Sequence, residues 1–197
     1  MCGRFEGYFP EGKLESPFDD IKWTYEQDDE KLKIHDIRPT NKIKCYYRDK
    51  DEFIVANVNW GIKFSPKMPL LINSRIETIK DKPYWFKMFD RYRAIVPMSA
   101  FYEWITEKGK KKQQRIFIKG MDIFFVPSIY HKKDDEVYVS FITVPSNKFM
   151  TKLHNRMPAI LNEEQARNYL TDEAEANLAK CVTLSDKIKM GFEPFEK

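Results

Sequence analysis

The chain begins MCGR, and the cysteine in second position is the first residue whose placement points to chemistry. Methionine aminopeptidases remove an initiator methionine when the next side chain is small, and cysteine is small enough. Removal of Met1 would leave Cys2 with a free α-amine and a thiol on adjacent carbon atoms. Such an aminothiol can form two bonds to one carbonyl carbon, which an internal cysteine cannot do. The position of Cys2 is therefore either incidental or the place where the chemistry of the protein occurs.

Three later stretches also place a polar side chain between apolar neighbours. They are INSRIET around Asn73, FYEW around Glu103 and LHNRMP around His154. Each has an ordinary structural explanation as well. Asn73 can make a structural hydrogen bond, Glu103 can be a surface carboxylate, and His154 can complement the C-terminus of a short helix. Taken one at a time, these residues leave both a catalytic and a structural role open.

No standard catalytic or nucleotide-binding motif competes with these residues. The sequence contains no GxxxxGK[ST], GxGxxG, GxSxG or HExxH pattern. Its histidines, His35, His131 and His154, are not paired with Cys, His or a carboxylate at ligand spacing. We therefore expect neither a metal site nor a cofactor.

The composition is that of a soluble globular protein. The 197 residues are 42% hydrophobic, 15% aromatic and 32% charged, without repeats or linkers, so we expect a single domain over residues 1–197. The net charge of +4 is compatible with nucleic acid but does not require it. Three cysteines without framework spacing favour a reducing compartment. No apolar run is long enough to span a membrane, and we expect a cytoplasmic monomer.

Strand patterns outnumber helix patterns along the chain. Strands are expected at 52–64, 93–104, 113–120, 122–130 and 136–144, with GKKK at 109–112 as a solvated hairpin tip. In the first of these, Ile54, Ala56, Val58, Trp60, Ile62 and Phe64 share one face. Helices are expected at 82–92, at 162–170 behind an Asn162–Gln165 capping box, and at 146–154. The predicted class is α+β, with a mostly antiparallel sheet or barrel and interspersed helices.

Taken together, four motifs are specific where each alone is weak. MCGR, NSRIET, FYEW and HNRMPAIL, in this order and at these separations, resemble the SOS-response-associated peptidase family of abasic-site processing proteins. HDIRPTN and the pair Trp60–Gly61 extend the resemblance, which runs from Cys2 to about Leu161. The chain departs from the family pattern in WGIKFSPK, which lacks a second tryptophan, at Ala100–Phe101, where glycine is usual, and in FVPSIY. These departures concern the DNA-binding surface and leave the four polar positions intact.

The resemblance implies a protein of the DNA damage response that binds single-stranded DNA and cross-links to abasic sites through its N-terminal cysteine. A free α-amine titrates at about 7.7–8.0, against about 10.4 for lysine, so part of it is unprotonated at neutral pH. The amine would form an imine with the ring-opened sugar aldehyde, and the thiol would then close a thiazolidine. In this scheme Glu103 is the general acid/base, His154 a second proton carrier, and Asn73 orients the amine or holds an oxyanion.

The resemblance also implies how DNA is held. Arg4 and Arg75 are the expected phosphate contacts, and Trp104, with Phe5 or Trp60, is expected to stack on bases. The partner is single-stranded DNA with an abasic site, so the protein would associate with the nucleoid when bound to damage. Self-processing that exposes Cys2 would explain a peptidase activity, and β-elimination from the imine would give a lyase activity.

Two other function classes remain open at this stage. An N-terminal-nucleophile glutamine amidohydrolase also begins with Met-Cys-Gly, but its Asn-Gly oxyanion element does not occur here. A non-covalent single-stranded DNA-binding module, in which Cys2 is incidental, would need only the arginines and aromatic residues. Covalent capture of abasic DNA separates the first reading from both alternatives.

Overall fold

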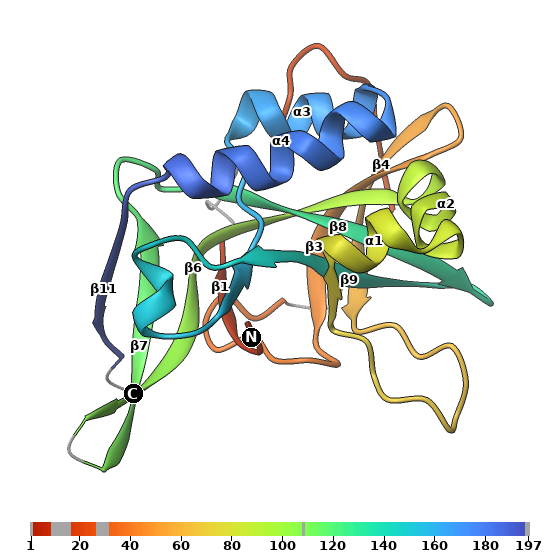
Figure 1. The fold of residues 1–197 in the computed structure, drawn as a ribbon. Helices are drawn as coiled ribbons and strands as arrows, with labels where there is room; N and C mark the ends of the chain where they lie inside the picture. Colours follow the sequence, from red (N-terminus) through yellow and green to blue (C-terminus); the bar gives the residue numbers. More distant parts are fainter. Residues whose placement is uncertain (1, 9–16, 27–31, 108, 196–197) are drawn as a thin grey trace.

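The computed structural model describes residues 2–8, 17–26, 32–107 and 109–195 (Figure 1). Eleven strands in these residues belong to one sheet. They are β1 (Phe5–Gly7), β2 (Trp23–Tyr25), β3 (Lys42–Asp49), β4 (Glu52–Trp60), β5 (Asn73–Arg75), β6 (Arg93–Glu107), β7 (Lys110–Ile118), β8 (Phe124–Lys133), β9 (Glu136–Pro145), β10 (Arg156–Pro158) and β11 (Met190–Pro194). Eight of the eleven strand pairings in the described residues are antiparallel, which confirms the mostly antiparallel α+β class.

The central strands close on themselves. β3 pairs with β4 and β6, β4 pairs with β9, and β8 joins β9 to β6, so these five strands form a ring. The predicted apolar face is confirmed within β4: Ile54, Ala56, Val58 and Trp60 are buried at 5% exposure or less, while Asn57 and Asn59 between them are partly exposed. Val55 is buried as well, and the strand ends at Trp60, before the expected end at residue 64. Burying this apolar face inside the ring removes it from water, which is the main favourable contribution to folding.

Helices lie outside the ring. Their bounds are α1 (Ile76–Asp81), α2 (Pro83–Arg91), α3 (Glu163–Thr171) and α4 (Ala174–Lys187), with a single 3-10 turn at Met150–Lys152. Figure 1 shows α3 and α4 side by side across one side of the sheet and α1 and α2 together beside the ring. α2 begins at Pro83, as its sequence predicts, because proline fits the first helical turn, where its missing N–H is not needed.

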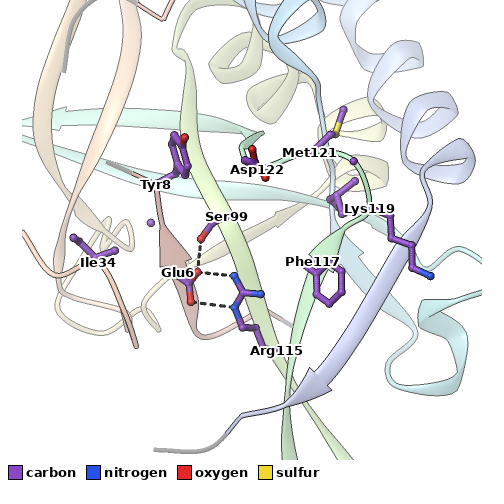
Figure 2. A pocket seen from close by; sticks show the side chains of 12 residues that line it. Glu6, Tyr8, Ile34, Ser99, Arg115, Phe117, Lys119, Met121 and Asp122 are labelled. Atoms are coloured by element: carbon purple, nitrogen blue, oxygen red, sulfur yellow. Dashed lines mark hydrogen bonds and ion pairs between the residues drawn. The ribbon is translucent and has the colours of Figure 1, made fainter. Parts of the chain in front are cut away.

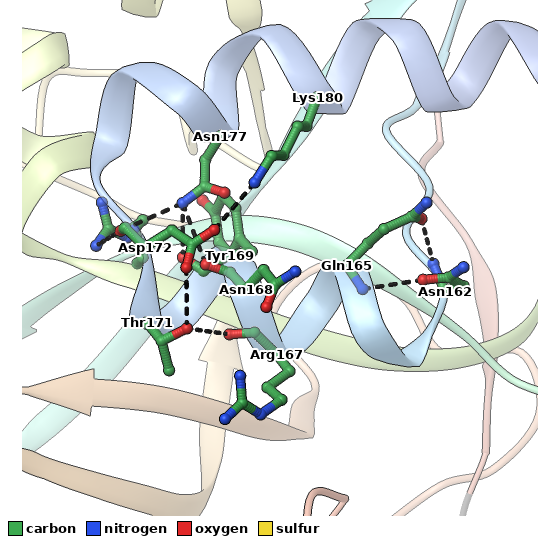
Figure 3. A network of polar contacts seen from close by, with 10 residues as sticks. Asn162, Gln165, Arg167, Asn168, Tyr169, Thr171, Asp172, Asn177 and Lys180 are labelled. Atoms are coloured by element: carbon green, nitrogen blue, oxygen red, sulfur yellow. Dashed lines mark hydrogen bonds and ion pairs between the residues drawn. The ribbon is translucent and has the colours of Figure 1, made fainter.

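A polar network closes the α3–α4 corner (Figure 3). The predicted capping box of α3 is confirmed: the Asn162 side chain accepts from the Gln165 N–H and the Gln165 side chain accepts from the Asn162 N–H, both at 2.9 Å. At the other end of α3, the Asn177 amide of α4 donates to the carbonyl oxygen of Asp172. Arg93 donates to the same carbonyl at 2.8 Å, placing a cation at the negative end of the helix.

Several elements differ from the sequence-based expectations. The expected helix over 146–154 is only the 3-10 turn Met150–Lys152. The lysines of GKKK lie in a strand and not in the hairpin tip, because Lys110–Lys112 are exposed residues within β7. Gly109 of the same stretch lies in the turn, and residue 108 is outside the described residues. The sequence patterns also did not indicate α1, α4 or β11, and β11 extends the sheet at the edge of β7.

The short strand β1 connects the start of the chain to the ring. β1 pairs with β6, with Phe5 opposite Phe101, and the Tyr102 N–H donates to the Arg4 carbonyl at 2.9 Å. The Phe5 ring makes edge contacts with Trp60 and Phe141, at centroid distances of 5.2 and 5.5 Å. These core contacts fix β1, and they therefore fix Cys2 three residues before Phe5.

Candidate active site around Cys2

Cys2 lies at the meeting point of β1, β5 and β6 and is fully buried. Its carbonyl oxygen accepts a hydrogen bond from the Asn73 side-chain amide at 2.9 Å. Its thiol donates to the Arg4 carbonyl with an Sγ–O distance of 3.6 Å. Asn73 is the first residue of β5, which runs parallel to β9 with Asn73 opposite Phe141. The structure therefore brings together the first and second sequence motifs through a direct contact.

Glu103 brings a carboxylate to this site. It is buried at 6% exposure on β6. Continuing the β1–β6 register from Phe5–Phe101 places Glu103 opposite Gly3, next to Cys2. Burial, reinforced by the nearby negative charge of Glu103, raises the pKa of the Cys2 thiol well above its usual range. Burial and the neighbouring charge of Glu103 therefore favour the protonated form of the thiol.

His154 lies between the 3-10 turn and β10. It follows the 3-10 turn, and its own N–H donates to the Met150 carbonyl at 2.8 Å. Its ring Nδ1 accepts from the Arg156 N–H at 2.9 Å. β10, which begins at Arg156, lies on one side of β9 and β5 on the other, because Thr143 of β9 pairs with both strands. The described contacts of His154 connect it with this neighbourhood but not directly with Cys2.

The two predicted phosphate-binding arginines have different surroundings. The Arg4 guanidinium pairs with Asp36 and donates to the Gln113 side chain at 2.7 Å, leaving its side chain only 15% exposed. Its fork is therefore occupied by protein groups. Arg75 is exposed at the end of β5, two residues after Asn73. Residues two apart on a strand point to the same side, so Arg75 is the better placed of the two for a phosphate.

The expected base contacts of Phe5 and Trp60 require correction. Both rings are fully buried, and the Trp60 ring stacks on Phe141 at 4.6 Å while its N–H donates to the Ile72 carbonyl. Their faces are therefore occupied by the core. Trp104 is 49% exposed. Because successive strand residues point to opposite faces, Trp104 leaves the sheet on the face opposite Glu103.

The sequence reading missed a charged cluster on the same β1 strand (Figure 2). Both oxygens of Glu6 accept from Arg115, at 2.7 and 3.1 Å, and Ser99 donates to one of them at 2.6 Å. Burial opposes ionisation of Glu6, but the Arg115 and Ser99 hydrogen bonds outweigh it and lower its pKa to about 2. The cluster borders a pocket of about 630 Å³ that also involves Lys119 and Asp122. Only strand pairing reveals it, since Glu6 and Arg115 are distant in sequence.

Two kinds of feature are absent from the described residues. No group of three or more His, Cys, Asp or Glu side chains in that part of the chain is arranged to hold a metal ion. None of the helices assigned there has the length and apolar character needed to cross a membrane.

The molecule is thus an α+β protein with a ring-closed, mostly antiparallel sheet, and it has a buried cysteine near the chain start that an asparagine holds by a hydrogen bond. The chain belongs to the SOS response associated peptidase (SRAP) family, whose model matches residues 1–196. This confirms the resemblance carried by the four motifs.

Individual relatives agree with the family match. The abasic site processing protein YoqW of Bacillus subtilis is 30% identical over 189 residues, covering 86% of this chain and 80% of its own. The abasic site processing protein YedK of Escherichia coli is 24% identical, covering 94% and 86%. Among solved structures, a phage-related protein of Bordetella bronchiseptica has a TM-score of 0.74 at 20% identity, covering 100% and 95%. That likeness shows the same fold.

Proposed function

We propose that this protein processes abasic sites in single-stranded DNA by forming a covalent thiazolidine cross-link through Cys2 after removal of Met1. The observation that carries the proposal is the contact set of Cys2: its carbonyl is held by Asn73 and its thiol lies in the field of buried Glu103. The relatives named abasic site processing proteins support the choice of substrate.

The chemistry divides into two bond-forming steps. The Cys2 α-amine adds to the aldehyde carbon of the ring-opened sugar, and the resulting carbinolamine loses water to give an imine. The thiol sulfur then adds to the imine carbon while its proton passes to the nitrogen, closing the five-membered ring. One water leaves overall. Because both nucleophiles belong to one residue, the second step is intramolecular and benefits from proximity.

The protonated state of the thiol sets the order of these steps. A thiol whose pKa is raised by burial and by Glu103 is a weak nucleophile, so the amine attacks first. Glu103 then relays the thiol proton to the nitrogen during ring closure, and it also serves the proton transfers that expel water. Asn73, already bonded to the Cys2 backbone, orients the amine. His154 supplies the second proton carrier, acting on the sugar oxygen.

DNA would be held mainly by Arg75, whose exposed guanidinium can contact a flanking phosphate, and by the half-exposed Trp104. We place this activity on the DNA itself, in the cytoplasm or at the nucleoid, and in a monomer. A self-processing peptidase step that exposes Cys2, and slow strand cleavage by β-elimination from the imine, belong to the same proposal.

Intact mass spectrometry of the protein with an abasic single-stranded oligonucleotide tests the proposal. We expect Met1 to be absent and the adduct mass to equal protein plus oligonucleotide minus one water. Cys2→Ala keeps the terminal amine but lacks the thiol, so it should give only an imine that borohydride traps. Non-covalent binding by the wild type without an adduct would instead identify a simple binding module, and hydrolysis of glutamine would identify an amidohydrolase.

A further inference from the structure

Arg156 lies two residues after His154 in the fourth motif. It forms an ion pair near the site and makes several further hydrogen bonds. Its two terminal nitrogens donate to both carboxylate oxygens of Glu77, at 2.5 and 3.0 Å. One of them also donates to the Thr143 carbonyl at 2.6 Å. The Arg156 side chain is only 11% exposed, whereas that of Glu77 is 46% exposed. Glu77 belongs to the second motif, so this pair links two motifs that are 79 residues apart.

The contacts of this pair continue on both sides toward proposed catalytic residues. On one side, the Arg156 N–H donates to His154 Nδ1. On the other side, Thr143 Oγ1 donates to the Ser74 carbonyl at 3.4 Å. Ser74 is the middle residue of β5, directly after Asn73. Polar contacts therefore run from the His154 ring, through β10 and β9, to the strand that carries Asn73.

The Arg156 amide also decides which ring nitrogen of His154 carries the proton. A backbone N–H can only donate, so Nδ1 must act as the acceptor. In a neutral imidazole one nitrogen accepts and the other carries hydrogen. The proton of neutral His154 therefore lies on Nε2, and that nitrogen is the one available to donate to a substrate oxygen.

We infer that Glu77 and Arg156 are positioning residues, which fix the backbone amide that holds His154 as its Nε2–H tautomer. The inference rests on the proposed function only for the consequence in cross-linking. Glu77 fixes the Arg156 side chain, Arg156 fixes the start of β10, and the amide of Arg156 orients the imidazole. A neutral Nε2–H then donates to the sugar oxygen during ring opening, rather than removing a proton from it.

The test uses Glu77→Gln, which removes the charge but keeps the shape of the side chain. Asp20→Asn is the matched control, because Asp20 is 54% exposed and is likewise paired with an arginine, Arg167. Arg156→Lys is a second variant, since lysine keeps the positive charge but has no fork. Melting temperatures of all variants show whether they fold.

The first readout is the tautomer itself, from long-range proton–nitrogen NMR of the histidine rings at a pH well above about 6.5. The chain has only three histidines, and His154→Gln assigns the signals. We expect wild type and Asp20→Asn to show hydrogen on Nε2 of His154, and Glu77→Gln and Arg156→Lys to show a mixture of tautomers. Hydrogen on Nδ1 in the wild type, or an unchanged tautomer in both variants, would overturn the inference.

The second readout separates binding from the covalent step. With saturating abasic DNA, we expect Glu77→Gln to cross-link roughly 10-fold more slowly, with its DNA dissociation constant within about 2-fold of wild type. An equal loss of DNA affinity would show that Arg156 contacts DNA instead, and wild-type rates would show that the pair is only structural. If the wild type itself forms no cross-link, the proposed function fails, while the tautomer measurement still decides the positioning role.

Discussion

At the scale of single residues, the site consists of a protonated thiol, a buried carboxylate and an amide that holds the chain between them. Asn73 donates to the Cys2 carbonyl, and in the proposed mechanism this hydrogen bond positions the α-amine without adding charge. The negative charge of Glu103 acts on the Cys2 thiol, and in the same proposal Glu103 serves the proton transfers. The proposal therefore assigns orientation to one residue and proton transfer to the other, and each role can be tested separately.

Glu103→Gln tests the proton-transfer role. The variant keeps a side chain of the same size but cannot accept a proton, so we expect cross-linking to slow by about 100-fold or more. Single-turnover mass spectrometry at saturating abasic DNA measures the rate. Loss of the negative charge also brings the Cys2 thiol pKa closer to its usual range. A rate equal to wild type would remove Glu103 from the mechanism.

Glu6 gives a pH-dependent contribution to stability that is separate from catalysis. Its pKa falls from an ordinary 4.5 to about 2 in the folded protein, so the folded state favours the ionised form. The stabilisation is present above about pH 4.5 and disappears as the pH falls toward 2. We expect Glu6→Gln to lower the free energy of unfolding by about 2 kcal/mol at neutral pH.

Urea unfolding of wild type and Glu6→Gln between neutral pH and pH 3 measures this difference. The two proteins should converge in stability as the solution becomes acidic. A gap that stays constant with pH would mean that Gln destabilises through packing and not through the lost ion pair with Arg115.

At the scale of elements, two short strands hold Cys2 and Asn73 in place: Cys2 lies just before β1, and Asn73 begins β5. β1 and β5 have three residues each, too few to be stable alone. They hold their positions because β1 pairs with long β6 and β5 pairs with β9. The turn after β4 also depends on its surroundings. Gly61 in this turn has a φ of +115°, and a Cβ at this position would lie 2.7 Å from the Leu70 side chain.

Gly61→Ala and Gly109→Ala form a matched pair that separates steric overlap from backbone strain. Gly109 also has a positive φ, of +75°, but a Cβ at Gly109 would meet nothing within 4 Å. We expect Gly109→Ala to cost about 1 kcal/mol of unfolding free energy and Gly61→Ala about 3 kcal/mol or more. Thermal melting checks the order, and equal losses would show that Leu70 moves aside freely.

The sequence indicated elements well where the pattern was local and less well where it depended on distant pairing. The alternation in 52–60 and the Asn162–Gln165 capping box need only neighbouring residues, and both were confirmed. The same alternation grouped Trp60 with Ile54 and Val58 on the apolar face, and the burial of that face is why the expected stacking of Trp60 on bases was wrong. The Glu6–Arg115 pair and the Glu77–Arg156 pair depend on strands that meet only after folding, so the sequence alone gave no signal for them.

At the scale of the whole molecule, ring closure brings all four motifs to one region. β6, which contains Glu103, pairs with β1. β9 pairs with β5 on one edge and with β10 on the other. The net charge is only +4, so a general electrostatic attraction for DNA is weak. In the proposed function, affinity must therefore come from a few well-placed cations, and Arg75, two residues after Asn73, is an exposed one.

Arg75→Ala tests this view of DNA binding. We expect binding to all single-stranded sequences to weaken alike. In a plot of the logarithm of the binding constant against the logarithm of the salt concentration, the slope should fall in magnitude by about 1, because one phosphate contact is lost. Fluorescence anisotropy in a Cys2→Ala background measures binding without cross-linking. Arg4→Ala serves as the comparison: its guanidinium is held by Asp36, so its salt slope should stay at the wild-type value.

The complete burial of Cys2 has a consequence for how long the protein stays competent in a cell. Peroxides and electrophiles react with exposed thiolates, and a buried, protonated thiol offers them neither access nor charge. Cys45 and Cys181 are buried as well, so the folded chain should take up an alkylating reagent slowly and label at three sites only after denaturation. Oxidative stress produces both abasic sites and oxidants. In the proposed function, a thiol protected by burial would escape oxidation and remain able to react with abasic sites.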